Sequence, residues 1–148
     1  MPMIHLRTRR CDYNFQITQK YNLLIGDSGT GKTELVNTVD AYDLDKQAVQ
    51  CFDYKLLKTD RRLSREDLMR LKDYVIFLDE NSPLLHQKDV ASVLENSQNY
   101  FVIICRDVTL GFKSISLDSV FVMKTSGQYH TFEKATKPKW CNERVNVF

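Results

Sequence analysis

The stretch from Gly26 to Thr33, Gly-Asp-Ser-Gly-Thr-Gly-Lys-Thr, constrains the fold of this chain more than any other. It fits the pattern G-x-x-x-x-G-K-[ST] at every position. The apolar run 21–25 before it has the length of a buried strand, and residues 34–39 after it are typical of a helix. Glycines let such a loop curl so that backbone N–H groups point inward, and the following helix adds its positive dipole end. The pattern therefore predicts a strand, a phosphate-binding loop and a helix, in that order.

This loop, with the strand before it and the helix after it, resembles the P-loop (Walker A) nucleotide-binding family. The resemblance implies that Lys32 reaches the β- and γ-phosphates of a nucleotide and that the Thr33 hydroxyl holds Mg²⁺. The residues it places against the nucleotide are Gly26, Asp27, Ser28, Gly29, Thr30, Gly31, Lys32 and Thr33. The alternative that the pattern leaves open is a glycine-rich turn that binds nothing.

A second candidate site follows the apolar run 74–78, which ends in Asp79 and Glu80. Such a run is typical of a central parallel strand covered on both faces. A carboxylate after it lies at the rim where open α/β sheets bind ligands. Asp79 resembles the Walker B aspartate, which holds Mg²⁺, and Glu80 resembles the catalytic glutamate that orients and deprotonates the attacking water. The other interpretation is a surface turn with two acidic residues.

A third candidate is Arg106, which follows the apolar run 100–105. In ATPase families that carry the extra glutamate, a polar residue at this point senses the γ-phosphate. That residue is commonly Asn, Ser, Thr or His, so Arg106 departs from the family pattern and matches it by position only. Three roles stay open for it: a phosphate contact, an ion pair with Asp79 or Glu80 when no nucleotide is bound, and a salt bridge at the sheet rim.

The segments on either side of the region where strands and helices alternate predict short antiparallel strands. Residues 3–8 and 13–17 predict a strand pair, in which Tyr13 and Phe15 belong either to the core or against an adenine base. At the other end the sequence predicts a hairpin, with strands at 120–123 and 129–132 joined by a turn at Gly127-Gln128.

The elements between the candidate sites are less strongly marked. Residues 49–53 predict a strand and 55–62 a basic, mobile connection. Ser64 and Asp67 predict a capping box at the start of a short helix. Pro83 suits the first position of a further helix, which is predicted to run to about residue 97.

The order of elements predicts one domain over residues 1–148, with an N-terminal strand pair in 1–18 and an irregular tail over 134–148. The predicted fold class is α/β, a doubly wound, mostly parallel P-loop sheet with short antiparallel strands at both ends of the chain. The resemblance further implies that the strand at 100–105 lies between the strands at 21–25 and 74–78.

The composition of the chain limits the classes of function that are expected. The chain has 148 residues, 43% of them hydrophobic and 27% charged, and a net charge of +2, which gives no argument for a nucleic-acid or membrane partner. The basic stretch 55–72 holds seven Lys and Arg against three acids, too mixed to support nucleic-acid binding. No signal-peptide core or membrane-length apolar run is present, so a cytoplasmic protein is expected.

The cysteines and histidines add no metal or catalytic site. The four cysteines are far apart without a C-x-x-C pair, which argues against a zinc ribbon. Cys51 and Cys105 lie in apolar runs and are interpreted as core residues. His86 and His130 are interpreted as solvated or structural.

The resemblance as a whole implies an ATP- and Mg²⁺-binding ATPase of the branch with an extra catalytic glutamate, home of AAA+, RecA-like and ABC-like proteins. Its catalytic residues would be Lys32, Glu80 and Arg106, and its metal ligands Thr33 and Asp79. The expected function is slow or partner-stimulated ATP hydrolysis that acts as a nucleotide-dependent switch.

Several features of those families are missing from the sequence. The chain has no helical lid after residue 123, no LSGGQ-like signature and no assignable arginine finger, although Arg61, Arg62 and Arg65 are candidates by charge. A protein partner or a second copy of the chain is therefore expected to supply the missing groups.

Two alternatives stay open. The first is a small-molecule P-loop kinase in which 58–65 forms a lid. The second is an ATP-binding interaction module with little turnover, which uses the loop 107–119 and the tail around Trp140. No guanine-reading motif follows a late strand, which favours ATP over GTP.

Overall fold

The computed structural model describes residues 3–17, 19–26, 31–44, 50–52, 56–60, 63–79, 82–105 and 119–134. Nine strands in these ranges form one sheet, in the order β4-β1-β2-β9-β8-β3-β7-β6-β5. The strands are β1 (Met3–Arg7), β2 (Asp12–Gln16), β3 (Tyr21–Ile25), β4 (Gln50–Phe52), β5 (Leu56–Thr59), β6 (Lys72–Asp79), β7 (Gln98–Cys105), β8 (Ser119–Ser126) and β9 (Tyr129–Lys134). The helices are α1 (Lys32–Leu44), α2 (Arg65–Arg70) and α3 (Val90–Asn96), with a 3-10 turn η2 (Pro83–His86).

One half of the sheet is parallel. Strand β3 pairs in parallel with β8 on one side and with β7 on the other, and β7 in turn pairs in parallel with β6. Strand β7 therefore lies between β3 and β6, as the resemblance to P-loop ATPases implied. Its residues Phe101, Val102 and Ile103 are fully buried, because both faces of this part of the sheet are covered.

The other half of the sheet contains the antiparallel pairs. Strands β1 and β2 form one hairpin and β8 and β9 form another, which confirms both predicted strand pairs. Strand β2 also pairs in parallel with β9, with Tyr13 opposite His130. This pairing joins the N-terminal and C-terminal strands into the same sheet as the parallel half.

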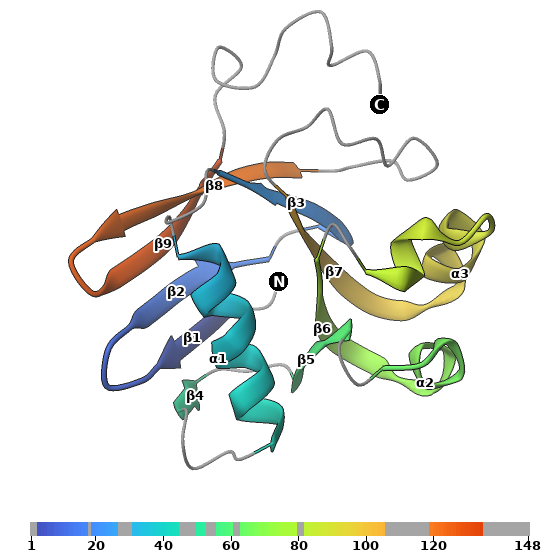
Figure 1. The fold of residues 1–148 in the computed structure, drawn as a ribbon, viewed down its shortest axis with the longest axis horizontal. Coiled ribbons are helices and arrows are strands. Elements are labelled where there is room, and N and C mark those ends of the chain that lie inside the picture. Colours follow the sequence, from blue (N-terminus) through green and yellow to red (C-terminus); the bar gives the residue numbers. More distant parts are fainter. Residues whose placement is uncertain are drawn as a thin grey trace, which may run out of the picture.

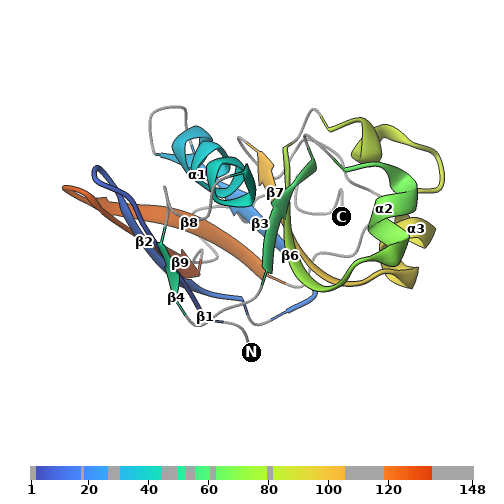
Figure 2. The ribbon, with the colours of Figure 1, turned by 90° about the horizontal axis from the view of Figure 1, so that it is seen from below.

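The sheet curls around α1 (Figure 2). Leu35, Val36 and Val39 of α1 belong to a core cluster that also contains residues of β1, β2, β6, β7 and β8. Helices α2 and α3 lie on the opposite face, beside β6 and β7 (Figure 1). Leu68 of α2 and Leu94 of α3 belong to the second core cluster there.

The predicted fold class is wrong. A doubly wound α/β sheet is mostly parallel and is covered by helices on both faces along its length. Here the described residues form a mixed, curled sheet with three α-helices, of which α2 has 6 residues and α3 has 7. The predicted membership of the P-loop family, in the ATPase branch with an extra glutamate, is contradicted by the same architecture.

The physical reason for the error is the pairing of β2 with β9. Alternating apolar residues correctly indicated strands in both segments, but alternation does not show which strand is the neighbour. The antiparallel strands were expected as short additions at the chain ends. They instead continue the sheet, and the twist of so many adjacent strands produces the curl.

Two local predictions are also wrong. The predicted connection 55–62 contains a strand, β5, which pairs in parallel with β6 and buries Leu57. The helix predicted from Pro83 to about residue 97 is divided into η2 and α3, although Pro83 does stand at the start of η2. Both segments are short, so their patterns carried little information on length.

The capping box of α2 is confirmed. The Ser64 hydroxyl accepts a hydrogen bond from the Asp67 N–H at 3.1 Å, and the Asp67 carboxylate accepts one from the Ser64 N–H at 3.1 Å. The hydrogen bond from the Ser64 N–H, with further ones from the Ser64 side chain and from Arg70, lowers the pKa of the Asp67 carboxyl. In the described part of the chain, no helix has both the length and the apolar character of a membrane span.

Candidate phosphate-binding site

Three strands end at the same edge of the sheet. Ile25, the last residue of β3, is level with Cys105 of β7, and Asp79 at the end of β6 is level with Ile104. Adjacent strands lie about 4.8 Å apart, so β3 and β6 end roughly 10 Å from each other with β7 between them. The beginning of the predicted phosphate loop, Gly26, and the predicted metal ligand Asp79 therefore belong to one edge.

Lys32 is buried at this edge. It is the first residue of α1, its exposed fraction is 7%, and its Nζ donates a hydrogen bond to the Cys105 carbonyl at 3.4 Å. A lysine ammonium is rarely buried unless polar groups surround it. The contact holds the cation at the end of β7, between the strand that leads into the loop and the strand that carries Asp79.

The glycines at both ends of the loop have positive φ angles, 152° at Gly26 and 97° at Gly31. At Gly31 a side chain would also lack space, because a Cβ atom would lie 3.1 Å from His130 Cε1 and 3.1 Å from Met123 Sδ. The Gly31 carbonyl accepts hydrogen bonds from the Tyr13 hydroxyl at 3.3 Å and from the Leu35 N–H at 2.9 Å. Glycine is required here by both conformation and packing.

Tyr13 and His130 support the loop at Gly31. Their rings stack with centroids 4.6 Å apart and planes inclined by 20°. The His130 Nδ1 is also 2.9 Å from the Thr125 hydroxyl. Both residues are buried, so the structural interpretation of His130 and the core interpretation of Tyr13 are confirmed. Phe15, the other residue considered for an adenine contact, is buried in a stack on Phe132.

Burial shifts the pKa of both support residues in the direction that favours the neutral form. It raises the pKa of the Tyr13 hydroxyl, and the nearby carboxylate of Glu34 adds to that increase. It lowers the pKa of the His130 imidazole, against a smaller opposing effect of Glu34. The support of Gly31 is therefore an uncharged pair at neutral pH.

We expect His130 to make stability depend on pH. The unfolded chain takes up a proton at this histidine near pH 6.5, whereas the folded ring has a lower pKa. The contribution of His130 to stability is therefore independent of pH above about pH 7. Stability decreases as the pH falls below 6.5, because the unfolded chain then binds a proton more readily than the folded one. Thermal unfolding from pH 7.5 to 5.5 should show a smaller loss for His130→Gln than for the wild type. Equal losses would contradict this prediction.

The predicted metal ligands are in different elements of the site. Thr33 is exposed on the first turn of α1, and Asp79 is exposed at the end of β6, where its carbonyl accepts a hydrogen bond from the Ser82 N–H at 2.9 Å. Within the described ranges, no three His, Cys, Asp or Glu side chains are close enough to hold a metal ion. One hydroxyl and one carboxylate suit Mg²⁺, which commonly takes its other ligands from phosphates and water.

Several predicted site residues lie outside the described residues. These are Asp27, Ser28, Gly29 and Thr30 of the loop, the predicted base Glu80, and Arg106. Four further predictions also lie outside the described residues: Arg61, Arg62, the tail residue Trp140 and the loop 107–119. Of that loop only Ser119, the first residue of β8, is described. Their roles remain predictions.

Sequence reasoning missed the contacts that fix α1 against β5. Lys58 Nζ donates to the Asp43 carboxylate at 3.0 Å, and the Thr59 hydroxyl donates to Asp40 at 3.2 Å. Asp40 and Asp43 are near the end of α1, while Lys58 and Thr59 were assigned to a mobile connection. No local pattern links these positions, because the pairing depends on how β5 is placed in the sheet.

No family model matches this chain, and no curated protein matches it. Among solved structures, it is similar to a chain described as a model of ribosome-bound archaeal Pelota and ABCE1, with 11% sequence identity and a TM-score of 0.49. The alignment covers 99% of this chain and 36% of that chain, so this chain spans about a third of its length. A similarity at this level carries no argument about function.

Proposed function

We propose that the chain binds Mg²⁺-ATP through residues 26–33 and hydrolyses it slowly, or when stimulated by a partner, as a nucleotide-dependent switch. The observation that carries the proposal is the position of Lys32. Its ammonium group is buried at the carboxyl end of β7, beside the loop ends Gly26 and Gly31 and on the edge that carries Asp79. A fixed cation at the start of a 13-residue helix is well suited to a phosphate chain.

Each residue of this site has a proposed role. Lys32 neutralises the β- and γ-phosphates, and the loop backbone donates hydrogen bonds to their oxygens. Thr33 and Asp79 would hold Mg²⁺, which when bound offsets negative charge on the phosphates. Glu80 orients a water molecule and accepts its proton, and Arg106 contacts the γ-phosphate.

We expect turnover to be slow because no second arginine has been assigned to the site. In phosphoryl transfer an arginine supplied in trans raises the rate by roughly 10³ to 10⁵. We propose that a protein partner or a second copy of this chain supplies that group. ATP binding would then control the association, and association would control hydrolysis.

The kinase alternative is disfavoured by the contacts of its proposed lid. Lys58 is bound to Asp43, and Arg65 forms an ion pair with Asp89. Lys58 also belongs to β5, within the sheet. These parts of 58–65 are anchored to the body of the protein rather than placed to close over a substrate.

The test is phosphate release from ATP by the purified wild type, Lys32→Ala and Glu80→Gln. We expect Glu80→Gln to lower turnover at least tenfold while ATP binding persists, because only the water-activating group is lost. Lys32→Ala should lower both binding and turnover. Equal turnover in all three proteins would remove the ATPase assignment, and ATP binding without turnover in the wild type would favour the interaction module.

A further inference from the structure

A cleft lies beside α1 and reaches its first turn, where Glu34 lines it. Its volume is about 330 Å³, within the range of roughly 300–1,000 Å³ typical of small-molecule sites. One wall is the turn between β1 and β2, and the other is one face of α1. The lining residues are Thr8, Arg9, Arg10, Glu34, Asn37, Thr38 and Ala41.

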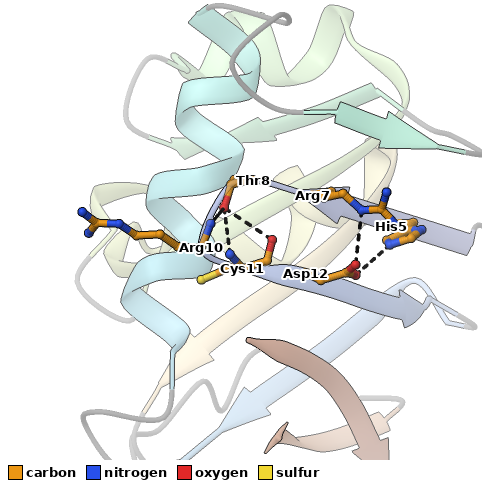
Figure 3. Close-up of polar contacts among 6 residues, drawn as sticks. All are labelled: His5, Arg7, Thr8, Arg10, Cys11 and Asp12. Carbon is orange, nitrogen blue, oxygen red and sulfur yellow. Dashed lines mark hydrogen bonds and ion pairs between the residues drawn. The ribbon is translucent and has the colours of Figure 1, made fainter. Parts of the chain in front are cut away.

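The turn that carries the two arginines is held by its own hydrogen bonds (Figure 3). The Thr8 hydroxyl accepts from the Arg10 N–H at 3.2 Å and from the Cys11 N–H at 3.0 Å, and the Thr8 N–H donates to the Cys11 carbonyl at 2.8 Å. Arg9 and Arg10 therefore project from a fixed backbone. Among the described residues, neither guanidinium group forms an ion pair, so both remain able to contact a ligand.

The cleft begins beside the first turn of α1, which starts at Lys32. Glu34 is three residues after Gly31, and Ala41 is seven residues after Glu34. At 1.5 Å per residue the cleft extends about 10 Å along α1 from its first turn. A ligand whose phosphate is bound by Lys32 at the start of α1 can therefore extend its other end into this cleft.

We propose that the cleft holds the ribose and base of the nucleotide, an inference that rests on the proposed function. A planar guanidinium group stacks on aromatic rings, so Arg9 or Arg10 can cover the base. Asn37 is exposed on α1 and offers an amide that both donates and accepts hydrogen bonds.

The burial of the aromatic residues of β2 favours an arginine for the stacking contact with the base. Tyr13 and Phe15 are the aromatic residues of β2, and both are engaged in stacks within the core. Neither faces a ligand in this arrangement. The arginines of the adjoining turn, which line an open cleft, are placed to take the stacking role instead.

The test compares two ligands that share phosphates and differ in the nucleoside. Wild type, the double variant Arg9→Ala/Arg10→Ala, Asn37→Ala and Lys32→Ala are titrated calorimetrically with a non-hydrolysable ATP analogue and with inorganic tripolyphosphate, both with Mg²⁺. Arg70→Ala is the control for the loss of one exposed positive charge, because Arg70 is exposed on α2, on the other face of the sheet, where it pairs with Asp67. Thermal unfolding of each variant confirms that it is folded.

We expect the double variant to bind the ATP analogue about tenfold more weakly, a change of about 1.4 kcal/mol that suits the loss of a guanidinium–ring contact. Its binding of tripolyphosphate should be unchanged. Asn37→Ala should show the same selectivity with a smaller effect. If the double variant binds both ligands like the wild type while Lys32→Ala binds both far more weakly, the cleft is not the nucleoside site and the proposed function stands. If the double variant lost affinity equally for both ligands, the arginines would contact phosphate rather than the base. Failure of the wild type to bind either ligand overturns the proposed function itself.

Discussion

Replacing Lys32 with alanine is expected to weaken binding of ATP about a hundredfold. A hydrogen bond from a charged group contributes about 1.5–3 kcal/mol, which corresponds to roughly 10- to 150-fold in a dissociation constant. The upper part of this range applies because Lys32 is 7% exposed, so water screens its charge less than on an open surface. Isothermal titration with a non-hydrolysable ATP analogue measures the change.

The control for charge is Lys72→Ala. Lys72 is exposed at the first residue of β6, the opposite end of the strand from Asp79, and its removal lowers the net charge equally. Lys32→Gln keeps much of the side-chain volume and tests whether a weak Lys32→Ala variant has lost packing rather than charge. Wild-type affinity in Lys32→Ala would refute the phosphate-binding role of this residue.

Replacing Gly31 with alanine is expected to destabilise the protein by about 3 kcal/mol. A non-glycine residue in a sparsely populated positive-φ conformation costs about 1–3 kcal/mol. The added Cβ would also approach His130 and Met123 to 3.1 Å, so these side chains must shift. Nucleotide binding should weaken as well, because the same shift displaces the end of the loop. Chemical denaturation measures the first effect, and titration with the ATP analogue measures the second.

Gly127→Ala separates the two causes. Gly127 has a φ angle of 60°, and no atom lies within 4 Å of the position of its Cβ. Its substitution adds only conformational strain, about 1–2 kcal/mol, and should leave nucleotide binding unchanged. In the background of Met123→Ala, the cost of Gly31→Ala should decrease because one of the two close contacts is removed. Equal losses for Gly31→Ala and Gly127→Ala would show that packing against His130 and Met123 is unimportant.

The sequence predicted the local elements of the site better than the fold that contains them. The apolar runs 74–78 and 100–105 indicated buried strands, and the structure has β6 and β7 there with Asp79 at a strand end. Local composition is sufficient for such a prediction, because burial on both faces requires consecutive apolar residues. The capping box of Ser64 and Asp67 was predicted for the same reason, since all its groups lie within four residues.

Contacts between distant segments could not be predicted. Nothing in the residues around His130 indicates that it stacks on Tyr13, and nothing around Leu56 to Thr59 indicates a neighbour in β6. The fold class failed for the same reason. It was inferred from the order of strands and helices along the chain, whereas the curl of the sheet depends on the pairing of β2 with β9.

That pairing also determines when the support of the loop can form during folding. Tyr13 and His130 are 117 positions apart, the difference of their residue numbers, yet they are directly opposite each other in the sheet. Contacts between such distant segments carry a large loop-closure entropy and tend to form late and slowly. Helix α1, which follows residues 26–31, can form early because its hydrogen bonds are local, whereas β3 needs its distant partners β7 and β8. The surface on which Gly31 rests is completed only when β9 has been synthesised and has joined β2, so the support of Gly31 depends on strands near both ends of the described chain.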